Sequence, residues 1–192
     1  MSGYEPGLGE VVLTLLIGGT IARPIYRRYI NTLDLASGDC VLDYGSGSGV
    51  CSKFLARRLQ NIDGHLTCLD VSRRWQTVIQ KMLNRYSNVD YLIGDIVVLA
   101  IPASSFDALL SHFVIHDIPA TERMEIVREW ARMLKPGGKV FLREPVSGSE
   151  GIALDELGGL MRQNGFVEAA SCIVPLPLMG DTFEGTFLKA FN

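Results

Sequence analysis

Residues 41–49 read VLDYGSGSG, an apolar run that ends in an acid and a tyrosine and is followed by three glycines on alternate positions. The apolar and β-branched residues 40–44 predict a short buried strand, and the apolar spacing of residues 50–59 predicts a helix. The glycines therefore lie at a strand-to-helix turn. Glycine permits positive φ and close approach of a ligand, and the free N–H groups of the following helix favour an anion. We interpret the segment as a ligand-binding turn.

The same stretch resembles motif I of class I S-adenosylmethionine (SAM)-dependent methyltransferases. The alternative is a dinucleotide site, whose motif ends in a small residue that lets helix and strand pack closely. Here Val50 occupies that position. The resembling family has an acid near the cationic end of the methionine moiety, and such an acid would repel a pyrophosphate. The resemblance implies that SAM contacts the following residues: Asp43, Gly45, Ser46, Gly47 and Gly49.

Two further acids follow apolar runs at the spacing that a nucleoside requires. Asp70 closes the run HLTCL, about 20 to 25 residues beyond the glycines, where an acid that binds ribose hydroxyls is expected. Its alternative role is a helix N-cap, which Ser72 can fill instead. Asp95 belongs to a third run, YLIGDI, and the resemblance implies that it holds the adenine amino group together with the backbone N–H of Ile96. Val71, beside Asp70, completes these expected SAM contacts.

The segment after the fourth predicted strand carries the chemistry. Residues 112–144 read HFVIHDIPATERMEIVREWARMLKPGGKVFLRE and are similar to the corresponding region of O-methyltransferases that act on phenolic and related hydroxyls. In that family the histidine of a His-Asp pair is the general base. The resemblance implies that His116 is the base and that Asp117 neighbours or orients it. Glu144, at the end of the fifth strand, is the available candidate for the family's second catalytic-side acid.

A general base suits methyl transfer to a hydroxyl. Displacement at a sulfonium has an excellent leaving group, so the protein mainly aligns the nucleophile, methyl carbon and sulfur. A hydroxyl is a poor nucleophile until its proton leaves. An imidazole with a pKa of about 6.5 accepts that proton at neutral pH. A capping role at a strand-to-helix junction is the alternative for His116 and Asp117. Ser111 and His112 end the fourth strand, where open α/β sheets bind ligands, and could contact SAM or substrate.

Composition predicts one soluble enzyme domain. The chain has 192 residues, 47% apolar content and a formal net charge of −3, which argues against a nucleic-acid surface. Its four cysteines show no metal spacing and it has only three histidines, so we expect reduced thiols and no metal site. The apolar residues 11–17 are too few to cross a membrane and lack a basic region before them. We therefore expect no membrane partner and a cytoplasmic location.

Strands that alternate with helices predict an α/β fold. We expect a Rossmann-like, seven-stranded, mostly parallel sheet with helices on both faces, and the resemblance adds an antiparallel last strand. Residues 1–34 are expected to form a helical cover, and residues 35–192 the SAM-binding domain as one compact unit. Long substrate-domain insertions are absent, so the pocket needs other walls. The N-terminal helices supply some of them, and a homodimer is another source.

The sequence therefore predicts a SAM-dependent methyltransferase that acts on a small molecule, with a hydroxyl oxygen as the preferred acceptor. Nitrogen or carbon acceptors are the near alternatives. A catalytically silent SAM-binding scaffold is a third, although the glycines and acids of the cofactor site are all present. A nicotinamide-dependent oxidoreductase is the least favoured interpretation.

Overall fold

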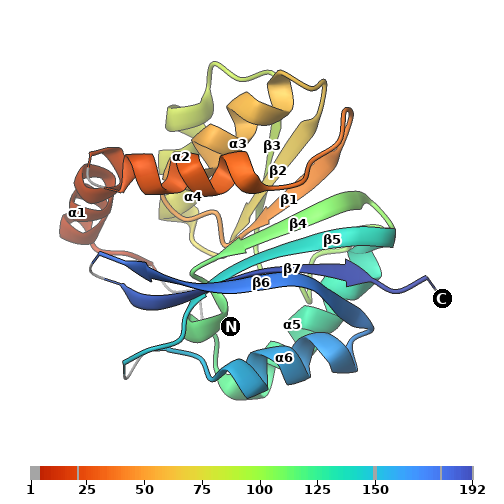
Figure 1. Ribbon diagram of the computed structural model, residues 1–192. Helices are drawn as coiled ribbons and strands as arrows, with labels where there is room; N and C mark the ends of the chain where they lie inside the picture. Colours follow the sequence, from red (N-terminus) through yellow and green to blue (C-terminus); the bar gives the residue numbers. More distant parts are fainter. Residues whose placement is uncertain (1–4, 21, 149–150, 178, 192) are drawn as a thin grey trace. The chain divides into compact units, whose positions relative to one another are not determined.

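The computed structural model describes residues 5–20, 22–148, 151–177 and 179–191. The chain divides into two compact units, Met1–Asp95 and Ile96–Asn192 (Figure 1). Residues 1–4 and 21 of the expected N-terminal cover lie outside the described residues. The division of the chain into a cover of residues 1–34 and a domain of residues 35–192 stays a prediction.

The first unit contains a parallel three-stranded arrangement in the order β3-β2-β1. Its elements are α1 (Leu8–Gly19), α2 (Arg23–Thr32), β1 (Cys40–Tyr44), α3 (Val50–Gln60), β2 (His65–Asp70), α4 (Arg73–Leu83) and β3 (Val89–Ile93). Helix α3 packs on β2 and on α4, and α2 packs on α3. The apolar periodicity of α3 explains this arrangement, because Leu55 and Leu59 recur one turn apart and are fully buried.

The second unit contains four strands in the order β4-β5-β7-β6. Its elements are β4 (Phe106–His112), the 3₁₀ helix η1 (Ile115–Asp117), α5 (Ala120–Met133), β5 (Leu134–Pro145), α6 (Leu154–Gln163), β6 (Phe166–Leu176) and β7 (Gly180–Lys189). Strands β4 and β5 are parallel, whereas β7 is antiparallel to both of its neighbours, β5 and β6. Helices α5 and α6 contact each other and pack on β5 and β6 respectively (Figure 1).

The predicted fold class is confirmed. The seven strands are mostly parallel, the last strand is antiparallel and helices surround them, in the expected Rossmann-like arrangement. One element differs from expectation, because the third strand spans Val89–Ile93 rather than residues 91–96. Gly94 has a φ of 139° and donates its N–H to the carbonyl oxygen of Asp70, so the chain turns away at this point. Asp95 therefore follows the strand instead of lying in it.

Among the described residues, no single helix is long and apolar enough to cross a membrane. Helices α1 and α2, which are bent relative to each other, reach the length and apolar composition of a membrane span only when the two are counted together.

Candidate active site

The glycine turn after β1 is tied to the end of β2. Gly45, Gly47 and Gly49 have φ values of 70°, 49° and 77°, which a residue with a side chain rarely adopts. The N–H groups of Gly45 and Ser46 donate to the carbonyl oxygen of Leu69 at 2.9 and 3.0 Å. The glycines form the predicted strand-to-helix turn with positive φ, and the turn is bonded back to the neighbouring strand β2.

The glycines of this turn have different surroundings. A Cβ atom on Gly49 would lie 2.4 Å from Cγ1 of Ile79, so this glycine permits the close packing of the turn on α4. A Cβ on Gly47 would meet nothing closer than the carbonyl oxygen of Gly45, at 3.8 Å. Gly49 is therefore required by packing within the unit, whereas Gly47 leaves open space above the turn.

Asp70 joins the glycine turn to the start of α4. Its Oδ2 accepts the N–H of Gly47 at 2.8 Å, and its Oδ1 accepts the N–H of Ser72 at 2.9 Å. Burial raises the pKa of Asp70, while these hydrogen bonds and the backbone of Val71 oppose the rise. Ser72 is the N-cap of α4 and accepts from the N–H of Trp75. The expected capping role thus belongs to Ser72.

Asp43 is buried within β1 and is 2% exposed. Ser52, in the first turn of α3, donates its hydroxyl to Oδ2 of Asp43 at 2.5 Å. Burial raises the pKa of Asp43 from 3.8 to about 7, Ser52 opposes this shift, and the charge of Asp70 adds to it. A buried carboxyl of this kind favours a cation close by, because a positive charge would offset the cost of its ionisation.

Asp95 and Ile96 come directly after the turn at Gly94. Asp95 is half-buried and ends the first unit, and Ile96 is buried and begins the second. Their role at the adenine stays a prediction.

Sequence analysis missed Glu5, which binds the beginning of α4. Its carboxylate accepts the hydroxyl of Ser72 at 2.9 Å and the N–H of Arg73 at 2.8 Å. The N-terminal end of a helix stabilises a negative charge, and these hydrogen bonds lower the pKa of Glu5. Glu5 also raises the pKa of Asp70 through its charge. The chain before α1 is thereby held beside the acid expected to bind ribose, a contact that no local pattern signals.

In the second unit, His116 and Glu144 form a close pair. The Nδ1 of His116 lies 2.7 Å from Oε2 of Glu144, whose side chain is fully buried. Oε1 of Glu144 also accepts the N–H groups of Val114 and Ile115 at 2.9 and 2.8 Å. The strand-end acid thus holds the beginning of η1 and one ring nitrogen of the histidine at the same time.

Arg123 of α5 holds the same segment from the carbonyl side. Its guanidinium donates to the carbonyl oxygens of Ile118 and His116 at 2.8 and 3.1 Å, and it pairs with Glu156 of α6 at 2.7 Å. With Glu144 binding the N–H groups and Arg123 binding the carbonyls, the backbone around His116 is fixed from both sides. Sequence analysis did not single out Arg123, because an arginine near a helix start is an ordinary surface residue.

Asp117 lies beside His116 at a longer distance. Its Oδ1 is 3.4 Å from Nε2 of His116, and its side chain is 78% exposed. Glu144 is therefore the carboxylate in close hydrogen-bond contact with the ring, and Asp117 is the outer neighbour.

His112 ends β4 in a different environment. Its Nε2 is 3.4 Å from Nη1 of Arg143, a residue of β5 that also pairs with Glu184 at 2.7 Å. Burial, together with the charge of Arg143, lowers the pKa of His112 from 6.5 to about 3. Phe113 follows with a φ of 59°, a conformation that is strained for a residue with a side chain. His112 is thus a neutral group at physiological pH.

Ser111, the remaining candidate, is fully buried in β4. Within the described part of the chain, its Oγ has no hydrogen-bond partner. Among the same residues, no group of three or more His, Cys, Asp and Glu side chains is placed to hold a metal ion.

Comparison with known proteins identifies the family. A family model for a methyltransferase domain matches residues 41–138, which are 98 of the 192 residues. This chain belongs to the methyltransferase domain family. The match begins at the first strand and includes the glycine turn, Asp70 and the His116 segment. It confirms the predicted class I SAM-dependent methyltransferase family with SAM as cofactor, and it sets aside the nicotinamide-dependent alternative.

Curated relatives of this methyltransferase domain differ in their acceptors. The phosphoethanolamine N-methyltransferase of Triticum aestivum is 27% identical over 141 residues, which are 73% of this chain and 27% of the relative. The ubiquinone biosynthesis O-methyltransferase of Coxiella burnetii is 29% identical over 124 residues, 63% of this chain and 50% of the relative. The demethylmenaquinone methyltransferase of Tropheryma whipplei is 30% identical over 120 residues, which are 62% of this chain and 46% of the relative. The chain spans half or less of the length of these relatives.

Solved structures agree on the fold. A SAM-dependent methyltransferase from Methanosarcina mazei has a TM-score of 0.72 at 19% identity, with 88% of this chain and 98% of that chain covered. A SAM-dependent methyltransferase from Aquifex aeolicus has a TM-score of 0.73 at 16% identity, with coverage of 97% and 100%. At these identities the likeness establishes the fold alone.

The first unit offers features that fit SAM. The space above Gly47 is open to a close-lying ligand, and Asp70 presents a carboxylate beside it. The Oγ of Ser46 is buried and, within the described part of the chain, has no hydrogen-bond partner, which suits a polar ligand group. The individual SAM contacts and the catalytic roles stay predictions.

Proposed function

We propose that this chain transfers the methyl group of SAM to a hydroxyl oxygen of a small molecule, with His116 as the general base. The observation that carries the proposal is the contact of 2.7 Å between Nδ1 of His116 and Oε2 of the buried Glu144. A histidine fixed by a buried acid is the arrangement expected of a base that must accept a proton at a defined place.

The contact with Glu144 supports Nε2 of His116 as the nitrogen that takes the proton. An ionised carboxylate only accepts hydrogen bonds, so Nδ1 of His116 donates and Nε2 is the acceptor of the neutral ring. When Nε2 takes the acceptor's proton, the ring becomes cationic and Glu144 stabilises it through Nδ1. Asp117, 3.4 Å from Nε2, adds a second negative charge next to the cation.

His112 is the less suitable base. Its low pKa, near 3, makes it a poor proton acceptor, and Arg143 lies against its Nε2. Its neutral ring and the buried hydroxyl of Ser111 instead suit polar contact with a ligand at the end of β4.

The first unit is proposed to bind the cofactor. Asp70 accepts the ribose hydroxyls, the glycine turn admits the methionine portion, and the buried Asp43 lies near its cationic end. Asp95 and Ile96 are proposed to bind the adenine. When bound, SAM supplies an electrophilic methyl group on a sulfonium. The protein's own task is then to hold the acceptor in line and to remove its proton.

The relatives give the range of acceptor chemistry. Their names include N-methylation of phosphoethanolamine, O-methylation in ubiquinone biosynthesis and methylation of demethylmenaquinone. All three names describe small-molecule acceptors, which supports a small molecule here. Oxygen is preferred because of the His116–Glu144 pair, since a neutral amine can attack without first losing a proton. Helices α1 and α2 are proposed to form the cover over the cofactor.

Two measurements test the proposed function, one of cofactor binding and one of methyl transfer. Thermal shifts with SAM, S-adenosylhomocysteine and NAD measure cofactor choice, and labelled-methyl transfer to phenols, amines and carbon acids identifies the acceptor. Asp70→Ala should weaken SAM binding by about 1 to 3 kcal/mol, because two ribose hydroxyls lose their acceptor. His116→Ala should keep SAM binding and slow transfer to a hydroxyl by about 10²- to 10⁴-fold.

His65→Ala is the matched control, since His65 is a half-buried histidine of the first unit that pairs with Asp90. It should leave transfer unchanged. Full activity of His116→Ala on a hydroxyl would exclude the general-base role. Transfer only to amines would replace the oxygen acceptor by nitrogen. SAM binding without transfer to any compound tested would favour the silent scaffold.

A further inference from the structure

Helix α1 exposes an unusual amount of apolar surface. Leu8, Val12, Leu13 and Leu16 are 75%, 56%, 59% and 60% exposed. The helix is anchored by few residues, chiefly Val11 and Gly18, which are its buried positions. The remaining side chains of the helix are almost all apolar. A surface of this kind is unfavourable in water and indicates a contact that buries it.

Gly18 shows how α1 is attached. A Cβ on Gly18 would lie 2.9 Å from Cγ2 of Val50, so the last turn of α1 packs directly on the beginning of α3. Leu8, Val12 and Leu13 lie in the first two turns and are exposed, whereas Val11 among them is buried. The helix is thus held at Val11 and Gly18 while these apolar side chains stay in solvent.

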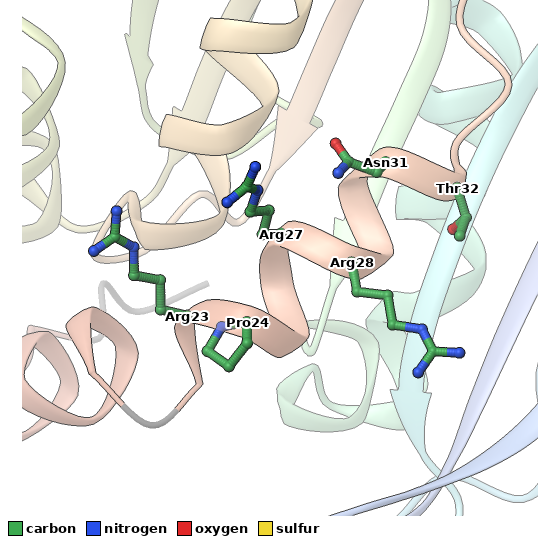
Figure 2. A pocket seen from close by; sticks show the side chains of 6 residues that line it. All are labelled: Arg23, Pro24, Arg27, Arg28, Asn31 and Thr32. Atoms are coloured by element: carbon green, nitrogen blue, oxygen red, sulfur yellow. The ribbon is translucent and has the colours of Figure 1, made fainter.

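Helix α2, which follows α1 in the chain, carries positive charge. Arg23, Arg27 and Arg28 are exposed and line a pocket together with Pro24, Asn31 and Thr32 (Figure 2). Figure 2 shows Arg23, Arg27 and Asn31 in one row along the helix, with Arg28 and Thr32 along the neighbouring row. Within the described residues, none of the three guanidinium groups has an ion-pair partner.

The local charge contrasts with that of the whole chain. Residues 8–32 contain three arginines and a single acid, Glu10, whereas the chain has a net charge of −3. Glu10 is engaged at the start of α1, where it accepts the N–H of Gly7. An apolar helix followed at once by a cationic one has the chemistry of a surface for negatively charged lipids.

We infer that α1 and α2 form a peripheral docking surface for an anionic lipid bilayer, which departs from the sequence-based expectation of no membrane partner. Leu8, Val12, Leu13 and Leu16 enter the boundary between head groups and acyl chains, and the three arginines meet the lipid phosphates. Helix α1 has twelve residues, about 18 Å in length, whereas the hydrocarbon core measures about 30 Å. The two helices meet at an angle of 66°, so they do not form one straight span.

Charge complementarity favours this occupant over a second copy of the chain. A twofold contact between α1 and α2 of both copies would offer the three arginines no acid of residues 8–32 other than Glu10. A bilayer that contains anionic lipids instead supplies a counter-charge for each of them. The inference concerns where the protein docks and does not depend on the methyl acceptor.

The experiment is co-sedimentation with vesicles of phosphatidylcholine alone and of phosphatidylcholine with phosphatidylglycerol as the minor lipid. The wild-type protein should partition onto the anionic vesicles and be released by high salt. Arg27→Gln should lower partition roughly fivefold, because one basic residue near an anionic surface contributes about that factor. Val12→Gln combined with Leu16→Gln should lower it by at least about tenfold.

The matched controls replace the same types of residue, arginine and valine, outside α1 and α2. Arg57→Gln removes an exposed arginine of α3, and Val98→Gln with Val167→Gln removes two exposed valines of the second unit. Both controls should partition like the wild type. Circular dichroism and thermal unfolding confirm that each variant is folded, which is expected because all these positions are exposed.

Three results would overturn the inference. The wild-type protein could remain in the supernatant with both kinds of vesicle at low salt. Arg27→Gln and Arg57→Gln could reduce partition equally, which would leave only a nonspecific charge effect. Sedimentation velocity could show a dimer that the Val12 and Leu16 changes dissociate, in which case the surface joins two copies of the chain.

Discussion

Asp43→Asn should change how the stability of the protein depends on pH. Asp43 is 2% exposed in β1 and is contacted by the hydroxyl of Ser52. Burial raises the pKa of Asp43 from 3.8 to about 7, so the folded chain holds a proton in a range where the unfolded chain has released it. The asparagine has nearly the same shape and does not titrate.

The direction and size of the change in the free energy of unfolding follow from this pKa. Because the folded pKa lies above the unfolded one, the wild-type free energy of unfolding should decrease as pH rises from about 4 to about 7 and then level off. Each pH unit in this window contributes about 1.4 kcal/mol, so the full effect is on the order of 4 kcal/mol. Asp43→Asn should lack this decrease. Relative to the wild type, it should gain stability from about pH 4 to about pH 7.

Urea unfolding at about pH 5 and about pH 8 measures the effect. Asp181→Asn is the control, because Asp181 is exposed and its substitution should leave the pH dependence unchanged. SAM titration near neutral pH adds a second readout, since a cation beside Asp43 should lower its pKa and release a proton. Parallel pH curves for the wild type and Asp43→Asn would refute the buried, titrating carboxyl.

Three further predictions concern single residues. Gly49→Ala should destabilise the fold by about 2 kcal/mol or more, because the φ of Gly49 is 77° and the new Cβ meets Ile79. Gly47→Ala should destabilise it by only about 1 kcal/mol but should weaken SAM binding. Urea unfolding and SAM titration of both variants measure these effects. Glu144→Gln should slow hydroxyl methylation by about tenfold or more and leave the SAM affinity unchanged, because His116 loses the negative charge that stabilises its cation. Single-turnover rates measure the effect. An unchanged rate would contradict a catalytic role for the His116–Glu144 pair. Cys172 should react with a thiol reagent in the native protein and Cys68 only after unfolding, since Cys68 is buried and burial raises its pKa; mass spectrometry of the labelled peptides locates the reaction.

Much of the fold could be predicted because its signals are local. The glycine turn, the acids at the ends of the first two strands and the alternation of apolar strands with helices each depend on residues close in sequence. Ser72 illustrates this, since its position before an apolar helix predicted the N-cap that the structure contains. The third strand was misplaced by a few residues, because Gly94 ends it through a backbone turn bonded to Asp70.

The candidate catalytic pair required tertiary structure. The sequence marked His116 and offered Glu144 as an acid at a strand end, but the two are 28 residues apart, and only the packing of η1 beside β5 brings them to 2.7 Å. Glu5 was not recognised, since it binds the start of a helix 68 residues further along the chain.

The sequence by itself determined the fold class and the family, because glycine spacing, strand-end acids and apolar periodicity are properties of neighbouring residues. Only the tertiary structure decided the state of the side chains. The raised pKa of Asp43, the lowered pKa of His112 and the fixed orientation of His116 all depend on burial and on charges from distant segments. These energies arise from long-range contacts, and no short stretch of sequence contains them.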